Sequence, residues 1–156
     1  TNNISLWESI IEENGVMVLN NQTVSYSKNG KSIAILGLSD KYGYLTNIVN
    51  PDDEIESVPL LLLSHRPEKL YSYFHSPNIT KPALVFTGHA HGGQIRLPFI
   101  NLGLFAPGQG IFPKYTSGLY TDKEAEKMIV SRGLCNSSLP IRINNRVHLP
   151  IITLTK

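Results

Sequence analysis

Three histidines follow two short apolar segments of the chain. Leu60–Leu63 is followed after one residue by His65, and Ala83–Phe86 runs into a glycine-rich string in which His89 and His91 are separated by one residue. In open α/β sheets, ligands bind just outside the carboxyl ends of the strands. Imidazole is a common ligand for Zn, Fe, Mn, Ni and Cu. The spacing therefore predicts a metal site made from these three histidines.

The residues around the His-x-His pair are predicted to shape the loop that carries it. Glycine lets the backbone turn sharply and approach a ligand closely, which assigns this supporting role to Gly88, Gly92 and Gly93, followed by Gln94. If residues 89–91 are extended, both imidazoles point to one face. If the chain turns there, the two imidazoles can serve two different metals.

Four further side chains are candidate contacts for an anionic substrate. Arg66 and Arg96 lie next to the two histidine segments, and Lys114 and Tyr115 lie in the long irregular stretch 88–118. Long loops inside a compact domain are usually functional, which favours this stretch as the place where substrate is recognised.

Other polar residues carry weaker signals. His75, at the end of a predicted helix, and His148, in a polar segment, are interpreted as ordinary polar residues. The acidic run 52–54 follows a proline and is interpreted as a solvated turn. Cys135 has no second cysteine and is interpreted as an inert thiol.

The elements that must position these residues form an α/β arrangement of about seven strands and two helices. A capping box at Ser5 predicts a first helix that ends near Gly15, and Pro67 begins a second helix that runs to about His75. Asn29-Gly30 is a strong two-residue hairpin signal. The predicted strands are 16–19, 23–27, 32–38, 60–63, 83–86, 127–130 and 151–155.

The helices are too few for the strands. The runs 60–63 and 83–86 have the continuous apolar pattern of strands covered on both faces, yet only two helices are available as cover. A second sheet, or a part of the protein outside these residues, is needed to cover the remaining face.

Composition and charge exclude several classes of protein. The chain has 156 residues, of which 41% are hydrophobic, and a net charge of +2, which suits one folded domain rather than a disordered segment. A single cysteine excludes a disulfide scaffold. With 14 basic and 12 acidic residues, the chain gives no reason to expect nucleic acid as a partner. No targeting segment is recognised in it.

Two strings resemble motifs of a known family. Leu-Leu-Ser-His-Arg-Pro-Glu at 62–68 and Thr-Gly-His-Ala-His-Gly-Gly-Gln-Ile-Arg-Leu-Pro at 87–98 resemble the last two motifs of calcineurin-like metallophosphoesterases. Pro-Lys-Tyr at 113–115 and Ser-Arg-Gly-Leu at 131–134 are similar to a bacterial branch of cell-envelope phosphoesterases, which often have an N-terminal membrane anchor or export signal. The likeness covers essentially the whole chain.

The resemblance implies two β-sheets packed face to face and flanked by helices. It also implies a hydrolase for phosphomonoesters or phosphodiesters, with a small phosphoester as substrate and two divalent metals, Mn, Fe or Zn, that activate a water. Carried over residue by residue, His65 and His89 bind the second metal and His91 binds the first.

The first three motifs of that family are missing from residues 1–156. In order, these motifs are Asp-x-His, Gly-Asp-x-x-Asp, and Gly-Asn-His followed by Asp or Glu. In the family they contain the bridging aspartate and the histidine usually cast as general acid. We therefore expect residues 1–156 to be the C-terminal portion of one metallophosphoesterase domain, inactive alone. Its expected partners are its own N-terminal portion or a second copy. The resemblance to that bacterial branch suggests a cell-envelope or membrane-anchored location for the intact protein, but the compartment is not assigned from these residues.

Two alternatives remain at this point. One is a complete small hydrolase that holds a single metal with His65, His89 and His91 and keeps an open water position. The other is a non-catalytic binding module that keeps the fold without the missing motifs.

Overall fold

The computed structural model of the chain describes residues 2–40, 45, 48, 57–100, 102–135 and 140–155. These residues form two α-helices and ten strands in mixed sheets, which confirms the predicted α/β fold. The helices are α1 (Asn2–Glu13) and α2 (Leu70–His75), and the 3₁₀ turn η2 (Pro67–Lys69) leads directly into α2.

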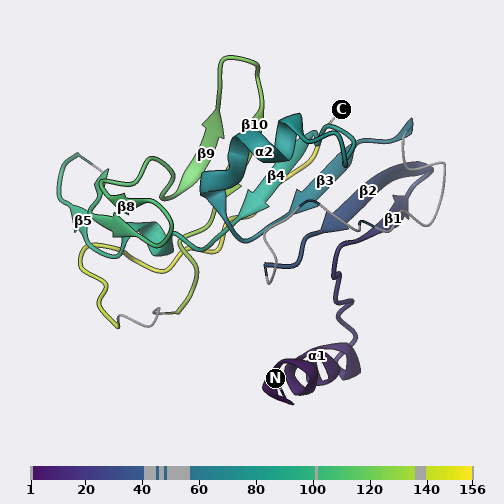
Figure 1. Cartoon of the computed structure of the whole chain (residues 1–156), viewed down its shortest axis with the longest axis horizontal. Coiled ribbons are helices and arrows are strands. Elements are labelled where there is room, and N and C mark those ends of the chain that lie inside the picture. The colour runs from purple at the N-terminus through teal and green to yellow at the C-terminus, as the bar shows by residue number, and fades with distance from the viewer. Residues whose placement is uncertain are drawn as a thin grey trace.

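Six of the strands form one sheet, in the order β1-β2-β3-β4-β10-β9 (Figure 1). Their bounds are β1 (Gln22–Lys28), β2 (Lys31–Gly37), β3 (Leu60–Leu63), β4 (Leu84–Thr87), β9 (Gly118–Thr121) and β10 (Lys127–Val130). β2, β3, β4 and β10 run parallel, whereas β1 and β9 pair antiparallel at the two ends. The carboxyl ends of four parallel strands therefore share one edge of the sheet.

The hairpin between β1 and β2 follows its turn signal. Asn29 and Gly30 have φ angles of 53° and 71°, the left-handed values that a type I′ turn needs at both central positions. The register pairs Lys28 with Lys31 next to the turn, and the predicted hairpin is confirmed.

One face of the sheet packs against α2. Leu70, Tyr73 and Phe74 of this short helix are buried against alternate residues of β2, β3, β4 and β10. Among those strand residues, Leu36 and Leu62 are at most 1% exposed. Burying a leucine of this kind stabilises the fold by about 1.5–3 kcal/mol, so this layer fixes the position of β3 and β4.

The stretch between β4 and β9 is built from short elements. They are the 3₁₀ turn η3 (His91–Gly93), the pair β5 (Arg96–Leu97) and β6 (Leu102–Gly103), and the pair β7 (Phe105–Ala106) and β8 (Gly110–Ile111). The two backbones touch where η3 meets β6, because a Cβ placed on Gly93 would lie 2.4 Å from the Gly103 Cα atom. Glycine is needed here for space as well as for conformation.

Several predicted boundaries are wrong. α1 begins at Asn2, so Ser5 lies inside the helix and is not its N-cap. Residues 16–19 and 151–155 have no strand partner in the described structure, and β9, which was not predicted, occupies an end of the sheet. An apolar run predicts burial, but a strand also needs a neighbour to hydrogen-bond.

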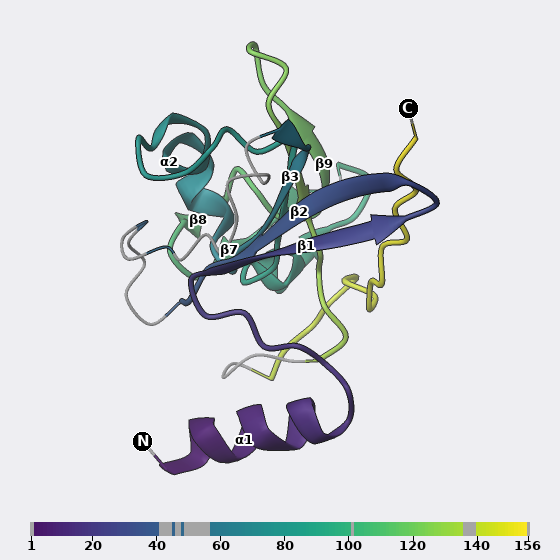
Figure 2. The same ribbon diagram turned by 90° about the vertical axis from the view of Figure 1, so that its right-hand side faces the viewer.

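The other face of the sheet has little cover. Figure 2 shows α2 on one side of the sheet and the C-terminal segment on the other. A groove on that side is lined by Ile33, Leu61 and Leu84 of the strands and by Leu154 of the C-terminal segment. The six-stranded sheet is the only large one among the described residues, which leaves the expected second large sheet without a counterpart in that part of the chain.

α1 stands apart from the sheet (Figures 1 and 2). Its apolar residues Ile4, Leu6 and Trp7 are 58–64% exposed. In the described part of the chain, no helix has the length and apolar character needed to cross a membrane.

Candidate metal centre

The polar residues that follow β2, β3 and β4 meet at the carboxyl edge of the parallel strands. Asp40 follows β2, His65 follows β3 and His89 follows β4. The loops are joined by their backbones: the Ser64 N–H donates to the Phe86 carbonyl at 2.9 Å, and the Gly88 N–H donates to the His65 carbonyl at 3.2 Å. The sheet register therefore continues into the loops and holds the two histidines side by side.

The His65 and His89 rings are in contact. Their centroids lie 4.5 Å apart and their planes are inclined at 56°. His65 is exposed and His89 is half-buried. The structure thus brings together two of the three histidines that the sequence singles out.

The His89 Nε2 atom is buried and makes no hydrogen bond with the described residues. Burial lowers the pKa of His89, and the neighbouring His65 lowers it further. A neutral imidazole with a free nitrogen is the form that binds a metal. A buried nitrogen with no hydrogen-bond partner costs free energy unless a ligand satisfies it, so this atom fits a metal ligand.

The chain turns between His89 and His91 rather than staying extended. The φ angles of these residues are 58° and 47°, left-handed values that are uncommon outside glycine. Backbone strain of this kind costs about 1–3 kcal/mol and clusters at functional sites. In the described structure, His65, His89 and His91 do not bring one ligand atom each within 4.8 Å of the others. A single metal held by all three therefore has no support in this geometry.

Two buried side chains hold the turn in place. Asn145 Nδ2 donates to the His91 carbonyl at 2.6 Å and to the Gln94 carbonyl at 3.1 Å. Arg96 Nη1 donates to the Gly92 carbonyl at 2.7 Å. Asn145 and Arg96 are 5% and 4% exposed. Arg96, a predicted substrate contact, is thus buried and bonded to the turn, and its contact with substrate stays a prediction.

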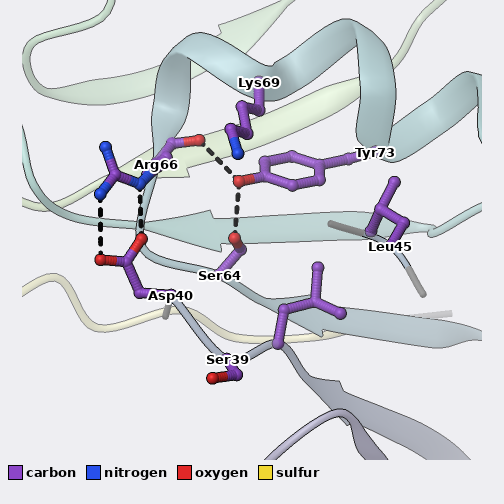
Figure 3. Close-up of a pocket in the computed structure, with 8 residues that line it drawn as sticks. Ser39, Asp40, Leu45, Ser64, Arg66, Lys69 and Tyr73 are labelled. Atoms are coloured by element: carbon purple, nitrogen blue, oxygen red, sulfur yellow. Dashed lines mark hydrogen bonds and ion pairs between the residues drawn. The ribbon is translucent and has the colours of Figure 1, made fainter. Parts of the chain in front are cut away.

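A second network fixes the segment on either side of His65 (Figure 3). Ser64 Oγ donates to the Tyr73 hydroxyl at 2.6 Å, and that hydroxyl donates to the Arg66 carbonyl at 2.8 Å. Burial raises the pKa of Tyr73 to about 12, which keeps its hydroxyl protonated. α2 therefore holds the residues immediately before and after His65.

Arg66 and Asp40 form a bidentate pair at this site (Figure 3). Arg66 Nε donates to Asp40 Oδ1 at 2.5 Å and Nη2 donates to Oδ2 at 3.1 Å. The hydrogen bond from Arg66 lowers the pKa of Asp40. Arg66 also lies 3.7 Å from the Glu68 carboxylate. Its guanidinium is thus engaged by protein carboxylates at the position where a substrate contact was predicted.

The remaining predicted residues lie in the loops. Lys114 and Tyr115 lie between β8 and β9, where the Lys114 ammonium sits 4.8 Å from the Tyr115 ring centroid. The supporting residues of the His-x-His loop include Gly92 and Gly93, which have left-handed φ angles of 67° and 79°. The adjacent Gln94 is 3% exposed.

Sequence reasoning missed Asp40, Glu68 and Asn145. Asp40 follows an apolar strand just as His65 does, and that parallel could have identified it. Glu68 Oε2 is buried without a hydrogen bond among the described residues, and the Glu68 charge acts on His89. Asn145 is 54 residues from the carbonyl it binds, and no local pattern marks it.

Curated proteins from bacteria and animals are similar to nearly the whole chain. YkuE of Bacillus subtilis (strain 168), named an uncharacterized metallophosphoesterase, is 30% identical over 96% of this chain and 50% of its own length. The uncharacterized protein YpbG of the same organism is 29% identical over 94% of this chain and 51% of its own length. A bovine transmembrane protein with metallophosphoesterase domain is 24% identical over 96% of this chain and 35% of its own length.

The chain spans about half the length of the two Bacillus relatives and about a third of the bovine one. No family model and no solved structure matches it. Named metallophosphoesterases nevertheless align with 88–99% of this chain at 24–30% identity, including a protein of that name from Caenorhabditis elegans. The α/β fold, with its polar loops at the carboxyl edge of the parallel strands, agrees with those names. Over nearly its whole length the chain is therefore similar to proteins named metallophosphoesterases, which supports that superfamily.

Proposed function

We propose that residues 1–156 supply the C-terminal half of a two-metal phosphoesterase site. In this proposal, His65 and His89 bind one divalent metal ion, and His91 binds the other. The substrate is a small phosphomonoester or phosphodiester. The ions, Mn, Fe or Zn, lower the pKa of a bound water and withdraw charge from the phosphate oxygens when they are present.

One observation carries the proposal: the contact between the His65 and His89 rings at the carboxyl edge, with the His89 Nε2 atom buried and free of hydrogen bonds. Two imidazoles at this separation suit one ion. Among the described residues, the three histidines do not bring one ligand atom each within 4.8 Å of the others, which favours two ions over one.

The charges favour an incomplete site. Two dications bound by three neutral imidazoles would carry a charge of +4, and carboxylates are needed to offset it. Asp40 is already paired with Arg66 through both carboxylate oxygens. We therefore propose that the bridging carboxylate and the general acid come from an N-terminal portion of the domain, and that residues 1–156 alone do not hydrolyse phosphoesters.

Metal binding tests the ligand assignment. We expect Mn²⁺ titrated into the chain to bind with an affinity that His89→Ala lowers by roughly the 10- to 100-fold that typifies damage to a metal site. His148→Gln is the matched control, because His148 lies outside the proposed ligand set. Equal Mn²⁺ affinity in His89→Ala and the unmodified chain would show that His89 is not a ligand.

Hydrolysis tests the division of the site. We expect no Mn²⁺-dependent release of nitrophenol from p-nitrophenyl phosphate or its bis ester by residues 1–156, above the rate with metal alone. A clear rate that His89→Ala abolishes would overturn the claim that ligands from outside these residues are essential.

A further inference from the structure

A second group of metal-binding residues lies away from the His65 and His89 pair. It consists of His75 at the end of α2 and of Glu124 and Glu126 in the turn between β9 and β10. One ligand atom from each lies within 4.8 Å of the others, and the described residues contain no other group of three or more candidate ligands this close.

The ring nitrogens of His75 have different partners. Nδ1 lies 2.9 Å from the Tyr71 carbonyl, one helical turn earlier, and the two rings stack at 4.1 Å. Since a carbonyl can only accept, Nδ1 must carry the hydrogen in this bond. This leaves Nε2 directed at the carboxylates, and metal-binding histidines commonly have their other nitrogen fixed in this way.

The turn brings both glutamates to that nitrogen. Asp122 Oδ1 accepts the N–H groups of Glu124 and Glu126, at 2.9 and 3.0 Å. The Glu126 side chain is only 1% exposed, and its Oε1 atom receives no hydrogen bond from the described residues. Lys81 is the competing cation, because its ammonium lies 3.0 Å from this oxygen, but the Lys81 side chain is 57% exposed. A buried carboxylate of this kind favours a bound cation.

The distances from His75 to the two glutamates are longer than a direct hydrogen bond and close to the separation of two ligands on one ion. His75 Nε2 lies 3.5 Å from Glu124 Oε2 and 3.9 Å from Glu126 Oε1. A protonated imidazole bonded to a carboxylate would give a separation of about 2.7–2.9 Å. Ligands on a tetrahedral Zn²⁺ ion, each about 2.1 Å from it, lie about 3.4 Å apart. The Glu124 distance matches the second case, and the Glu126 distance needs only a small closure.

We propose that His75, Glu124 and Glu126 form a Zn²⁺ site that ties the end of α2 to the β9–β10 turn. The site offers one nitrogen and two carboxylate oxygens, a donor set that Zn²⁺ accepts, and keeps one coordination position for water. Counted together with Lys81, the two carboxylates leave the site negative, which favours a cation there. The Glu124 side chain is 60% exposed, so ions can reach the site from solvent.

The experiment is a Zn²⁺ titration followed by calorimetry and by the thermal unfolding midpoint. All proteins carry Cys135→Ser, because Cys135 is an exposed free thiol that could bind Zn²⁺ itself. His89→Ala removes a proposed ligand of the other centre. In that background we expect Zn²⁺ to bind and to raise the unfolding midpoint, and Glu124→Gln to weaken binding by roughly 10- to 100-fold or more.

The control is Glu12→Gln, which removes the same charge from an exposed position in α1. It should leave Zn²⁺ binding unchanged. Equal Zn²⁺ affinity in Glu124→Gln and Glu12→Gln would overturn the proposal, as would a ¹⁵N spectrum in which the His75 Nε2 signal is unchanged by saturating Zn²⁺. The comparison of Glu124→Gln with Glu12→Gln separates this site from the other centre, because Glu124 lies outside the ligand set of the phosphoesterase proposal.

Discussion

At the scale of single residues, the His-x-His turn depends on a side chain distant in sequence. Asn145 Nδ2 satisfies the carbonyls of His91 and Gln94 in a buried position. We expect Asn145→Ala to lower the free energy of unfolding by about 1–2 kcal/mol, because the His91 and Gln94 carbonyls each lose one of two donors and keep only a backbone N–H. Asn20→Ala, at an exposed position before β1, is the control and should change it by less than about 0.5 kcal/mol. Urea unfolding measures both, and equal midpoints would contradict the role of Asn145.

The lowered pKa of His89 predicts that the metal-free chain loses stability in acid. Burial and His65 lower its pKa, so the folded form binds a proton less readily than the unfolded form does. The contribution of this residue to stability is therefore full above about pH 6.5, the ordinary histidine value, and is lost as the pH falls toward the lowered pKa of the folded form. We expect His89→Gln to reduce the loss of unfolding free energy between pH 7.5 and pH 5.5. His91 and His148, whose pKa values are also lowered by burial, should still cause part of the loss of unfolding free energy in this variant. An unchanged pH dependence in His89→Gln would contradict this account.

At the scale of elements, the turn is closed by the approach of η3 to β6. Gly93 and Gly30 both have left-handed φ angles, of 79° and 71°. They differ in the space around them: a Cβ on Gly93 would lie 2.4 Å from the Gly103 Cα atom, whereas a Cβ on Gly30 would have no atom within 4 Å. We expect Gly30→Ala to cost about 1–2 kcal/mol from backbone strain alone. Gly93→Ala should cost more, about 3 kcal/mol or above, and should also weaken Mn²⁺ binding. Chemical unfolding and metal titration of the two variants test the contrast. Equal costs would show that η3 can move away from β6.

Sequence reasoning found the elements whose signals are local. The Asn29-Gly30 turn, the leucine run of β3 and the start of η2 at Pro67 all follow from neighbouring residues. It missed β9 and wrongly made a strand of residues 151–155, because strand formation depends on which segments become neighbours. The same holds for the site. The two histidine motifs were visible as strings, but the pairing of Asp40 with Arg66, the burial of Arg96 and the meeting of His75 with Glu126 depend on tertiary packing.

At the scale of the whole molecule, two apolar surfaces are left open. One is the face of the sheet opposite α2, where Leu63 is 42% and Leu119 is 62% exposed. The other is α1, with Leu6 and Trp7 about as exposed. Exposed apolar side chains gathered on one surface are typical of an interaction site. The N-terminal portion proposed above, or a second copy of the chain, would cover these surfaces, and the Bacillus relatives are about twice as long as the chain.

This reasoning predicts that the isolated chain self-associates. Sedimentation velocity over a range of concentrations should show a species larger than a monomer, and the double change Leu6→Lys and Ile10→Lys should shift the equilibrium toward monomer by placing charges on the apolar side of α1. Glu12→Lys, at an exposed position of the same helix, adds positive charge without removing apolar surface and should leave association unchanged or nearly so. Trp7 is the single tryptophan of the chain, and it is 64% exposed in the monomer. Its fluorescence should therefore shift to shorter wavelength as association buries α1. A clean monomer at all concentrations, with Trp7 fully accessible to a quencher, would show that these surfaces are tolerated in water and would remove the physical argument for a covering partner.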